Sequence, residues 1–477
     1  MPKNQLVWLR QDLRTFDHSA LHYAMQAGPT LAVVVLSAQQ WRLHQDAQIK
    51  IDFYLRQLQQ LQTQLQALNV PLLVLQMNTW QDIAQAMLQL CQTYAIEKLY
   101  ANHEVGWNER ERDQQVQQQL QAHSIAVEFF HDRTLFPLAS IRNQNNQPYQ
   151  VFSAFKKQCY ARLSHALAPC YPVPSPQAPL TLDLAPELND LPSLTELGFT
   201  EIRPEQQALW PVGEDAALER LDSFIADQVE YYQHERDYPD LNGTSQLSAY
   251  LNTGIISIRT CVQALFRAQY GNFHFDNQGQ QTWLDELLWR EFYQHILFDF
   301  PQVSKHLPFK DNTRNLPWRD APEDLAAWQQ GQTGIPIVDA GMRQMHATGW
   351  MHNRVRMIVA MFLSKNLLID WRIGEAWFMQ YLIDGDLAAN NGGWQWCAST
   401  GTDAVPYFRI FNPISQSQKF DPKGAYIRRW VPELAHLNDQ DIHDPYAKYP
   451  TRKLDYPKPI VDLKQSRLRA LAAFKTG

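Results

Sequence analysis

The chain is poor in cysteine and lacks long apolar runs. Its five cysteines form no CxxC pair, which argues against a zinc site, an iron–sulfur cluster or a disulfide framework and favours a reducing, cytoplasmic location. The longest apolar run, residues 357–363, is far shorter than the roughly 20 residues that a membrane-spanning helix needs. Arg10 ends the first apolar run, so no signal peptide is visible. We therefore predict no metal site and no membrane partner.

The chain also lacks a positive net charge. Its value of −7 argues against a protein that coats nucleic acid by bulk charge, although a local basic strip would still allow binding. With 45% hydrophobic and 19% charged residues, the composition is typical of a globular protein. The length of 477 residues predicts roughly two to four domains. The 15 tryptophans are the one unusual feature of the composition.

The first 130 residues alternate between short apolar runs and helical patterns. Between the second and third runs, for example, leucines recur three or four residues apart, as on one face of a helix. Buried strands that alternate with such helices predict βαβ units and a parallel sheet, that is, a Rossmann-like α/β domain over residues 1–132. No GxGxxG follows the first run, so any dinucleotide should bind elsewhere. The predicted strands are residues 5–9, 30–36, 71–76, 98–102 and 125–130.

A different pattern follows this first part. Nine of the 28 prolines lie in residues 169–211, which predicts an irregular connector within residues 133–214. From residue 215 to residue 477 helical spacing dominates, so we predict a second, mostly α-helical domain. Its clearest predicted helices are residues 215–230, 283–298, 337–347, 352–369 and 374–383.

The most unusual segment is residues 384–396, DGDLAANNGGWQW. It combines two carboxylates, two adjacent asparagines, three glycines and two indoles. It could be a polar turn with two core tryptophans, or a hydrolase site in which one carboxyl raises the pKa of the other. The hydrolase is disfavoured because both acids come from one tight turn, whereas flanking a bond usually requires opposed positions. We therefore favour a cradle for a cofactor.

Two arginines, Arg354 and Arg356, open a predicted helix. Because they are two residues apart, their side chains point in different directions. One could pair with Asp384 or Asp386 inside the protein, since a buried carboxylate needs such a partner, while the other faces a phosphate. Alternatively, both are ordinary surface arginines.

Another predicted helix carries a carboxylate beside flat rings. Glu286 lies three and four residues before Trp289 and Arg290, so the three share one face. An indole that stacks on a base, next to a carboxylate that bonds its edge, suits a nucleobase. A tryptophan-rich core helix is the alternative.

Two further segments could bind anions. Residues 243–248, GTSQLS, are typical of a helix start with hydroxyl caps, where backbone N–H groups favour an anion, although ordinary capping is the alternative. Basic residues also gather late in the chain and could form a local footprint for nucleic acid, although a solvated surface is the default. They are Arg409, Lys419, Lys423, Arg428 and Arg429.

Together these segments resemble the cryptochrome/photolyase family of flavoproteins. The chain is most similar to its bacterial class I members, which act on cyclobutane pyrimidine dimers, and the resemblance runs nearly from end to end. The matching blocks are Leu6–Arg14, Trp283–His295, Thr333–Arg343, Gly349–Met357, Asp384–Gly401 and Tyr407–Pro413.

The resemblance implies an N-terminal α/β domain and a helical domain that holds FAD, whose reduced anion is the active form. Arg356 would favour that anion, and Asn390 would face flavin N5. Plant-type cryptochromes carry an aspartate at the position of Asn390, so the asparagine favours repair. The implied FAD contacts are Tyr232, Thr244, Ser245, Gln246, Leu247, Ser248, Trp283, Glu286, Arg290, Asn353, Arg356, Asp384, Gly385, Asp386 and Asn390.

The resemblance also implies light-driven repair of DNA, in which reduced FAD donates an electron to a flipped-out pyrimidine dimer. Trp289 and Trp396 would form walls around the dimer, and Glu286 would bond it. Photolyases of 6-4 photoproducts carry a histidine in place of Asn353, so the asparagine supports the cyclobutane substrate. The implied DNA contacts are Glu286, Trp289, Arg290, Tyr293, Asn353, Arg354, Met357, Trp396, Arg409 and Gln416.

Three tryptophans match the electron relay of the family. By resemblance, Trp394 would lie near the flavin, Trp371 midway and Trp318 at the surface. Such a relay reduces resting flavin in the light and is separate from the repair step.

The resemblance further implies a light-harvesting antenna. His44, Asn108 and Glu109 match positions that contact 5,10-methenyltetrahydrofolate, although a deazaflavin is an alternative and an ordinary acidic first turn would also explain Glu109. The implied protein is a monomer. The competing functions are a cryptochrome-type blue-light receptor without repair activity and a non-photochemical flavin oxidoreductase.

Overall fold

The computed structural model describes residues 3–185, 188–271, 275–448, 450–451 and 453–476. Contacts between Cα atoms divide the chain into two compact units. The first unit is Met1–Val229 with Ser245–Pro301, and the second is Glu230–Thr244 with Gln302–Gly477. The division of the sequence at residues 132 and 214 stays a prediction, because the units follow spatial contacts and each combines separate segments.

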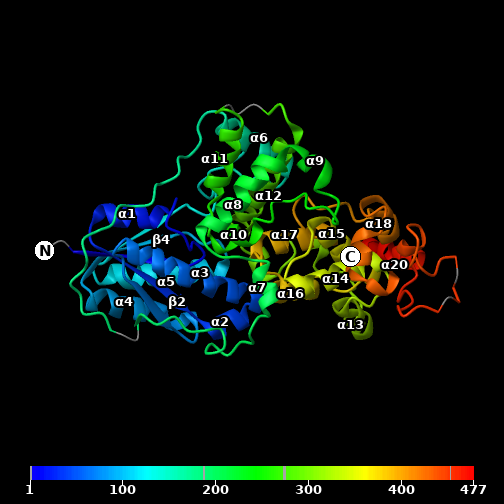
Figure 1. Ribbon diagram of the computed structural model, residues 1–477, viewed down its shortest axis with the longest axis horizontal. Helices are drawn as coiled ribbons and strands as arrows, with labels where there is room; N and C mark the ends of the chain where they lie inside the picture. The colour runs from blue at the N-terminus through cyan, green and yellow to red at the C-terminus, as the bar shows by residue number, and fades with distance from the viewer. Residues whose placement is uncertain (1–2, 186–187, 272–274, 449, 452, 477) are drawn as a thin grey trace. The chain divides into compact units, whose positions relative to one another are not determined.

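A five-stranded parallel sheet lies in the first unit (Figure 1). The strand order is β3-β2-β1-β4-β5, and every neighbouring pair is parallel. All five predicted strands are confirmed, and the parallel α/β fold with them. The strands are β1 (Asn4–Leu9), β2 (Thr30–Leu36), β3 (Leu72–Gln76), β4 (Ile96–Asn102) and β5 (Ala126–Phe130).

Helices cover both faces of this sheet because alternate residues of a strand point to opposite sides. Val7 and Leu9 of β1 pack in a cluster with α1 (Ser19–Ala27) and α3 (Gln48–Ala67). Leu6 and Trp8 pack in the opposite cluster with α4 (Ile83–Thr93) and α5 (Trp107–Ala122). A short helix, α2 (Ala38–Leu43), follows β2.

The rest of the first unit combines helices with irregular segments. Among the described residues, the proline-rich stretch at 169–211 contains one α-helix, α7 (Pro204–Ala208), which begins with proline at its first position. The predicted connector at 133–214 is therefore not irregular throughout, because it also contains α6 (Phe152–Leu163). The predicted helices near residues 215–230 and 283–298 are confirmed as α8 (Glu214–Asp227) and α12 (Gln278–Asp299). The others are α10 (Ser248–Thr253) and α11 (Ile258–Ala268).

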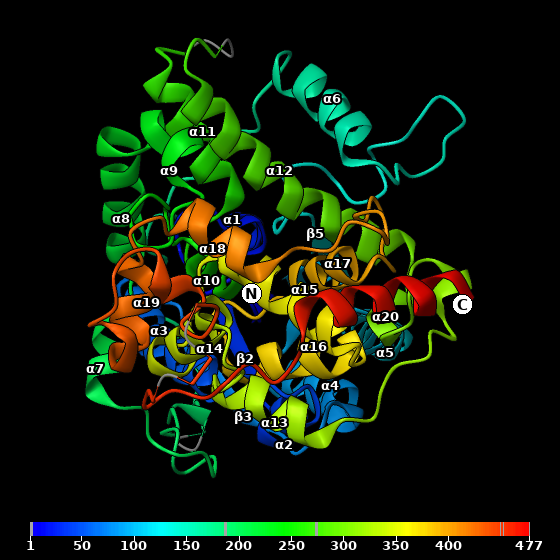
Figure 2. The ribbon, with the colours of Figure 1, turned by 90° about the vertical axis from the view of Figure 1, so that its right-hand side faces the viewer.

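The second unit is helical, as predicted, and its described residues form no β-strand (Figure 2). The predicted helix at 352–369 is α15 (Asn353–Met361), continued by a π-helical turn, η6 (Phe362–Leu367). The other α-helices are α9 (Tyr232–Glu235), α13 (Pro322–Gln330), α14 (Pro336–Thr348), α16 (Trp371–Tyr381), α17 (Leu387–Ala398), α18 (Pro413–Phe420), α19 (Ala425–Trp430) and α20 (Leu463–Thr476).

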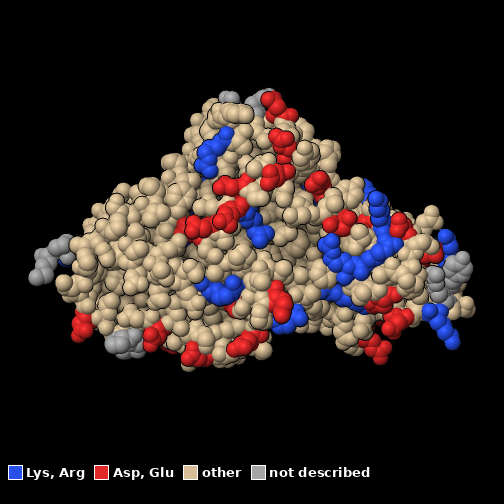
Figure 3. Space-filling model, in the orientation of Figure 1, with Lys and Arg blue, Asp and Glu red and all other residues tan. Residues whose placement is uncertain are grey.

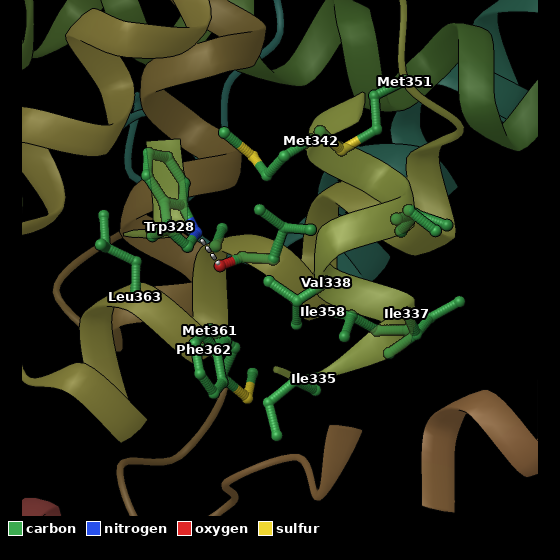
Figure 4. Close-up of a cluster of buried hydrophobic side chains, with 14 of the residues drawn as sticks. Trp328, Ile335, Ile337, Val338, Met342, Met351, Ile358, Met361, Phe362 and Leu363 are labelled. Atoms are coloured by element: carbon green, nitrogen blue, oxygen red, sulfur yellow. Dashed lines mark hydrogen bonds between the residues drawn. The ribbon is translucent and has the colours of Figure 1, made fainter. Parts of the chain in front are cut away.

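One large apolar cluster holds the second unit together (Figure 4). Ile337 and Val338 of α14 pack in it with Ile358 of α15 and Phe362 of η6. Trp328 of α13 is fully buried and donates its indole N–H to the Val359 carbonyl at 3.3 Å. Burying an indole with its N–H paired avoids the free-energy cost of an unsatisfied donor.

Membrane-spanning helices, metal-binding clusters and disulfides are all absent from the described residues. None of their helices has both the length and the apolar character that crossing a membrane requires. No group of three or more His, Cys, Asp or Glu side chains among them could hold a metal ion. The five cysteines are free thiols, four of them buried.

Candidate functional site

The segment at residues 384–396 forms the start of α17 and the turn before it. Asp386 caps the helix, because its side chain accepts a hydrogen bond from the Ala389 amide at 2.9 Å. Asp384 lies in the preceding turn, and its two oxygens accept from Nη2 of Arg356 at 3.0 and 2.9 Å. Each carboxyl is therefore engaged by a different partner, which disfavours the paired-carboxylate hydrolase.

Arg356 is held firmly on α15. Its Nε donates to the Met351 carbonyl at 2.7 Å, while its Nη2 pairs with Asp384, whose side chain is only 4% exposed. The prediction that one of the two arginines pairs with one of the two aspartates is confirmed. Among the described residues Nη1 has no hydrogen-bond partner, so this charged group keeps a donor for something else.

Arg354 points elsewhere, as its spacing from Arg356 predicts. Its Nε and Nη2 donate to one oxygen of Asp237 at 3.2 and 2.8 Å. Its guanidinium also lies over the Phe420 ring, 4.4 Å from the centroid. The arginine predicted to face a phosphate is therefore paired with a carboxylate. No pattern in the sequence indicates this pair, because Asp237 and Arg354 are 117 residues apart.

Asn390 is oriented by its neighbour Glu375. Its amide nitrogen donates to the Glu375 carbonyl oxygen at 3.0 Å, which leaves its side-chain oxygen as an acceptor without a partner among the described residues. The buried Glu375 carboxylate accepts from Asn391 at 2.9 Å and pairs with His306 at 3.0 Å, and this bond raises the pKa of His306. Glu375 thus holds two neighbouring amides, a role that the sequence did not indicate.

These groups fit a flat cofactor with polar edges. Arg356 keeps a free donor, and Asn390 keeps a free acceptor. A Cβ built on Gly393 would meet no atom within 4 Å, so there is open space beside this turn of α17. The reduced, anionic form of a flavin combines an anionic edge with a protonated ring nitrogen, so such donor and acceptor groups suit it.

The three tryptophans of the predicted relay lie in the same apolar cluster. Trp394 and Trp371 are buried, whereas Trp318 is only partly buried at the edge of the cluster. Trp394 packs edge-on against Phe378, with ring centroids 4.9 Å apart. Trp318 packs edge-on against Phe474 at 6.2 Å. Two buried indoles and one near the surface agree with the predicted order, but the relay stays a prediction.

The residues predicted on α12 lie in the first unit. Trp283 is buried and packs against Phe224, with ring centroids 5.1 Å apart. Trp289 stacks on Phe152 at 3.7 Å and on Tyr293 at 5.6 Å. The partly buried residues Glu286 and Arg290 lie on the same helix, and Arg290 donates to the Arg133 carbonyl at 2.8 Å. Sequence analysis missed Phe152, which supports one face of Trp289.

The predicted anion-binding segment, residues 243–248, differs from the expectation in one respect. The helix α10 begins at Ser248, but its N-cap residue is Leu247 and no side chain caps it. The predicted hydroxyl capping is wrong, because Leu247 has no hydroxyl and the backbone turns through a left-handed Gln246 (φ 48°). Among the described residues, the hydroxyls of Thr244, Ser245 and Ser248 have no hydrogen-bond partner.

The remaining residues differ in exposure. Tyr232 is buried, Asn353 and Arg409 are exposed, and Met357 and Trp396 are partly buried. Gln416 is partly buried on α18. On the face drawn in Figure 3, the densest group of basic side chains lies over the yellow-to-orange part of the chain in Figure 1, among acidic ones.

The residues predicted to contact the antenna come together in the first unit. His44 and Asn108 share a hydrogen bond of 3.1 Å. His44 and Glu109 line a cavity of about 80 Å³ with Trp41, Trp80 and Arg112 among others. Burial, together with the Glu104 charge, raises the pKa of Glu109 to about 7, and burial lowers the pKa of His44.

The chain is similar to known proteins over nearly its whole length. Residues 5–177 match the model "DNA photolyase", and residues 283–476 match "FAD binding domain of DNA photolyase". Deoxyribodipyrimidine photo-lyases of Salmonella typhimurium and Vibrio cholerae are 41% and 42% identical to the chain, covering 99% of it and 98% and 99% of their own lengths.

Solved structures are similar as well. A class III photolyase from Agrobacterium tumefaciens has a TM-score of 0.85 at 34% identity, covering 100% of this chain and 98% of its own. A Synechocystis cryptochrome has a TM-score of 0.84 at 29% identity, covering 99% of both chains. A photolyase from Sulfolobus tokodaii, solved with two FAD molecules, has a TM-score of 0.83 at 28% identity, covering 99% of this chain and 100% of its own.

The parallel sheet and the helical unit with its fixed polar groups therefore define an FAD-binding protein of the photolyase type. The chain belongs to the DNA photolyase family. FAD is thus its flavin cofactor, and DNA is the nucleic acid on which its family acts.

Proposed function

We propose that this chain is a deoxyribodipyrimidine photo-lyase that uses light and reduced FAD to split cyclobutane pyrimidine dimers in DNA. The observation that carries the proposal is the fixed polar pair Arg356 and Asn390, found in a chain 41% identical over its length to an enzyme of that name. When bound in its reduced form, FAD supplies an electron to the dimer on illumination.

The helical residues would set the charge of the flavin. A fixed guanidinium favours a nearby anion. Asp384 keeps the Arg356 guanidinium in place by accepting hydrogen bonds from Nη2 only, so the Nη1 donor stays available. The free oxygen of Asn390 would accept a hydrogen bond from the protonated N5 nitrogen without adding charge. Hydroxyls of Thr244, Ser245 and Ser248 would hold the phosphates. The remaining proposed contacts are Tyr232, Gln246, Leu247, Trp283, Glu286, Arg290, Asn353, Gly385 and Asp386.

The dimer would be held by stacking and by one carboxyl. We propose Trp289 and Trp396 as the walls and Glu286 as the hydrogen-bonding group, with Asn353 and Met357 beside them. Photolyases act on flipped nucleotides, and a damaged dinucleotide costs less to unstack than an intact one. Arg354, Arg409, Gln416, Arg290 and Tyr293 would contact the flanking DNA. Contacts to phosphate position the duplex without reading sequence, as repair throughout a genome requires.

Trp394, Trp371 and Trp318 would conduct an electron inward to resting flavin. The burial of the first two and the partial exposure of the third support this order. Indoles form transient radicals, so a spaced file of them can carry an electron from the surface.

For the antenna we propose 5,10-methenyltetrahydrofolate, bound at the rim formed by His44, Asn108 and Glu109. The second FAD of the Sulfolobus relative shows that a flavin can occupy a photolyase of this fold. However, pockets that enclose a ligand usually have about 300–1000 Å³, and this cavity has about 80 Å³. A ligand at the rim therefore fits better than one buried inside. We also propose that the protein is monomeric and cytoplasmic.

The decisive experiment is cleavage of a thymine dimer in an oligonucleotide under blue light by chemically reduced holoenzyme. We expect monomeric thymines in the light and none in the dark. Intact dimers after illumination, with FAD bound and reduced, would refute the proposal and favour the blue-light receptor. An absorption spectrum of the purified protein tests the folate, since folate and flavin absorb at different wavelengths.

A further inference from the structure

Lys365 is a buried cation that the function described so far does not use. It lies in η6, the π-helical turn after α15, and its side chain is fully buried (0% exposed). Its Nζ donates to Oγ of Ser399 at 2.7 Å and to the carbonyl oxygens of Tyr407 and Arg409 at 3.4 and 3.2 Å. An ammonium group has three N–H donors, so these three oxygens satisfy it completely.

The surroundings explain how this charge is tolerated without a carboxylate among its described neighbours. Ser399 ends α17 in a left-handed conformation (φ 66°), so Lys365 lies at the negative end of the helix dipole. The Phe474 ring lies 5.7 Å from its Nζ. The other titratable groups nearby are Lys310, which donates to the Ser399 carbonyl at 3.5 Å, and Cys397, whose pKa burial raises to about 12.

The two carbonyls that Lys365 holds belong to an exposed loop. The described residues between α17 and α18 form no helix or strand, and Phe408 is 56% exposed. Lys365 binds the backbone on both sides of Phe408, at Tyr407 and at Arg409. The Tyr407 ring also stacks on Phe474, with centroids 6.3 Å apart. The Arg409 amide also donates to the Pro406 carbonyl at 2.9 Å, and the Phe411 amide donates to Sδ of Met361 at 3.1 Å. Arg409 is among the proposed DNA contacts.

We propose that Lys365 is a positioning residue for DNA binding, which fixes the loop so that Phe408 and Arg409 meet the duplex in one conformation. The inference rests on the proposed function. An exposed segment that is not held would have to be ordered when DNA binds, and the lost conformational entropy would weaken the complex. Because Lys365 is buried, it acts through the backbone and not by touching a phosphate.

The test measures the affinity for dimer-containing duplex at several salt concentrations, with holoenzyme that carries FAD. Arg409→Gln removes one phosphate contact, so the slope of log affinity against log salt should fall by about 1 and the affinity about five- to tenfold. Lys365→Met should produce a similar loss although it removes no surface charge. The double variant should lose little more than either single variant. An unchanged slope in Lys365→Met, or losses that multiply fully in the double variant, would overturn the inference.

Lys310→Met is the matched control, because Lys310 bonds Ser399 but neither loop carbonyl. Any loss of affinity caused by Lys310→Met should be independent of the loss caused by Arg409→Gln, so the two free-energy changes should add in the double variant. If the wild-type protein repairs dimers and Lys365→Met binds DNA with full affinity, only this inference is contradicted. A wild-type protein that neither prefers nor repairs dimer DNA contradicts the proposed function instead.

A second measurement serves if Lys365→Met does not fold. Burial lowers the pKa of Lys365 to about 7, so the wild-type loop should loosen as the pH rises through 7 and one N–H donor is lost. In the Lys365→Arg variant, the arginine stays charged at all of these pH values. Affinity should therefore fall between pH 6.5 and pH 8.5 in the wild type and fall less in Lys365→Arg. An equal fall in both proteins would refute the inference.

Discussion

Replacing Gly374 by alanine would test where Trp394 lies. On α16, a Cβ built on Gly374 would be 2.1 Å from Cη2 of Trp394 and 2.6 Å from Cδ2 of Leu363. Carbon atoms in contact normally stay about 3.5–4.0 Å apart, so the indole would have to move by more than about 1 Å. It has little room, because Phe378 and Trp328 pack against it at 4.9 and 6.1 Å.

The sign of the stability change discriminates between two cases. Glycine to alanine inside a helix ordinarily stabilises a protein by about 1 kcal/mol. Overpacking a filled core costs about 1–3 kcal/mol, and the large overlap with Trp394 favours the upper end of that range. We therefore expect Gly374→Ala to lower the free energy of unfolding by about 1–2 kcal/mol. If neither Trp394 nor Leu363 lay against Gly374, the same change would raise it.

Two assays check this expectation: denaturant unfolding and the rate at which light reduces bound flavin. A displaced Trp394 should slow photoreduction if the indole belongs to the relay. Ile373→Ala is the control, because Ile373 is 41% exposed on the same helix and should change stability by no more than about 0.5 kcal/mol. A Gly374→Ala protein that is more stable than the wild type and photoreduces at the same rate would refute the reasoning.

Three further changes give separate tests. Trp371→Phe should abolish photoreduction while chemically reduced enzyme still repairs dimers; loss of both activities would contradict the separation of relay and repair. Asp237→Asn frees Arg354, and since a partly exposed ion pair contributes up to about 1 kcal/mol, undamaged duplex should bind up to about fivefold tighter at low salt; weaker binding would count against Arg354 as a phosphate contact. The pKa of Glu109 rises from 4.5 to about 7 on folding, so the folded state binds its proton more tightly and stability from this group is lost as the pH rises through that range. Glu109→Gln should flatten this part of the unfolding free energy measured against pH, and an unchanged profile would contradict the assignment.

The sheet could be predicted from the sequence because its information is local. Each strand is a short apolar run between helical patterns, and in a parallel sheet both faces of such a run are buried. The pairing of Arg356 with Asp384 was also within reach, because a carboxylate in a buried turn needs a cation and only two arginines opened the neighbouring helix. Only the structure decides between Arg354 and Arg356, since that choice depends on the direction of each side chain.

What the sequence could not indicate depends on contacts between distant segments. Glu375 orients Asn390 through a backbone carbonyl, which any residue type would supply. Lys365 belongs to a mostly apolar helical pattern, and its burial follows from the π-helical turn and from the end of α17, neither of which a hydrophobic period shows. The capping error at Leu247 has the same origin, because the position of the N-cap depends on where the backbone turns at Gln246.

The pairing of the cations also bears on how an acidic protein would search DNA. In the second unit, Arg356 pairs with Asp384 and Arg354 with Asp237, so two of the guanidiniums near the proposed site already have anionic partners. A phosphate that reaches Arg354 must therefore exchange with the Asp237 carboxylate, and the net gain in electrostatic free energy is smaller than for a free cation. We expect this exchange to keep the contribution of Arg354 to binding undamaged duplex small. Preference for a lesion then has to come from the stacking and hydrogen bonding of the flipped dimer, which undamaged DNA does not offer.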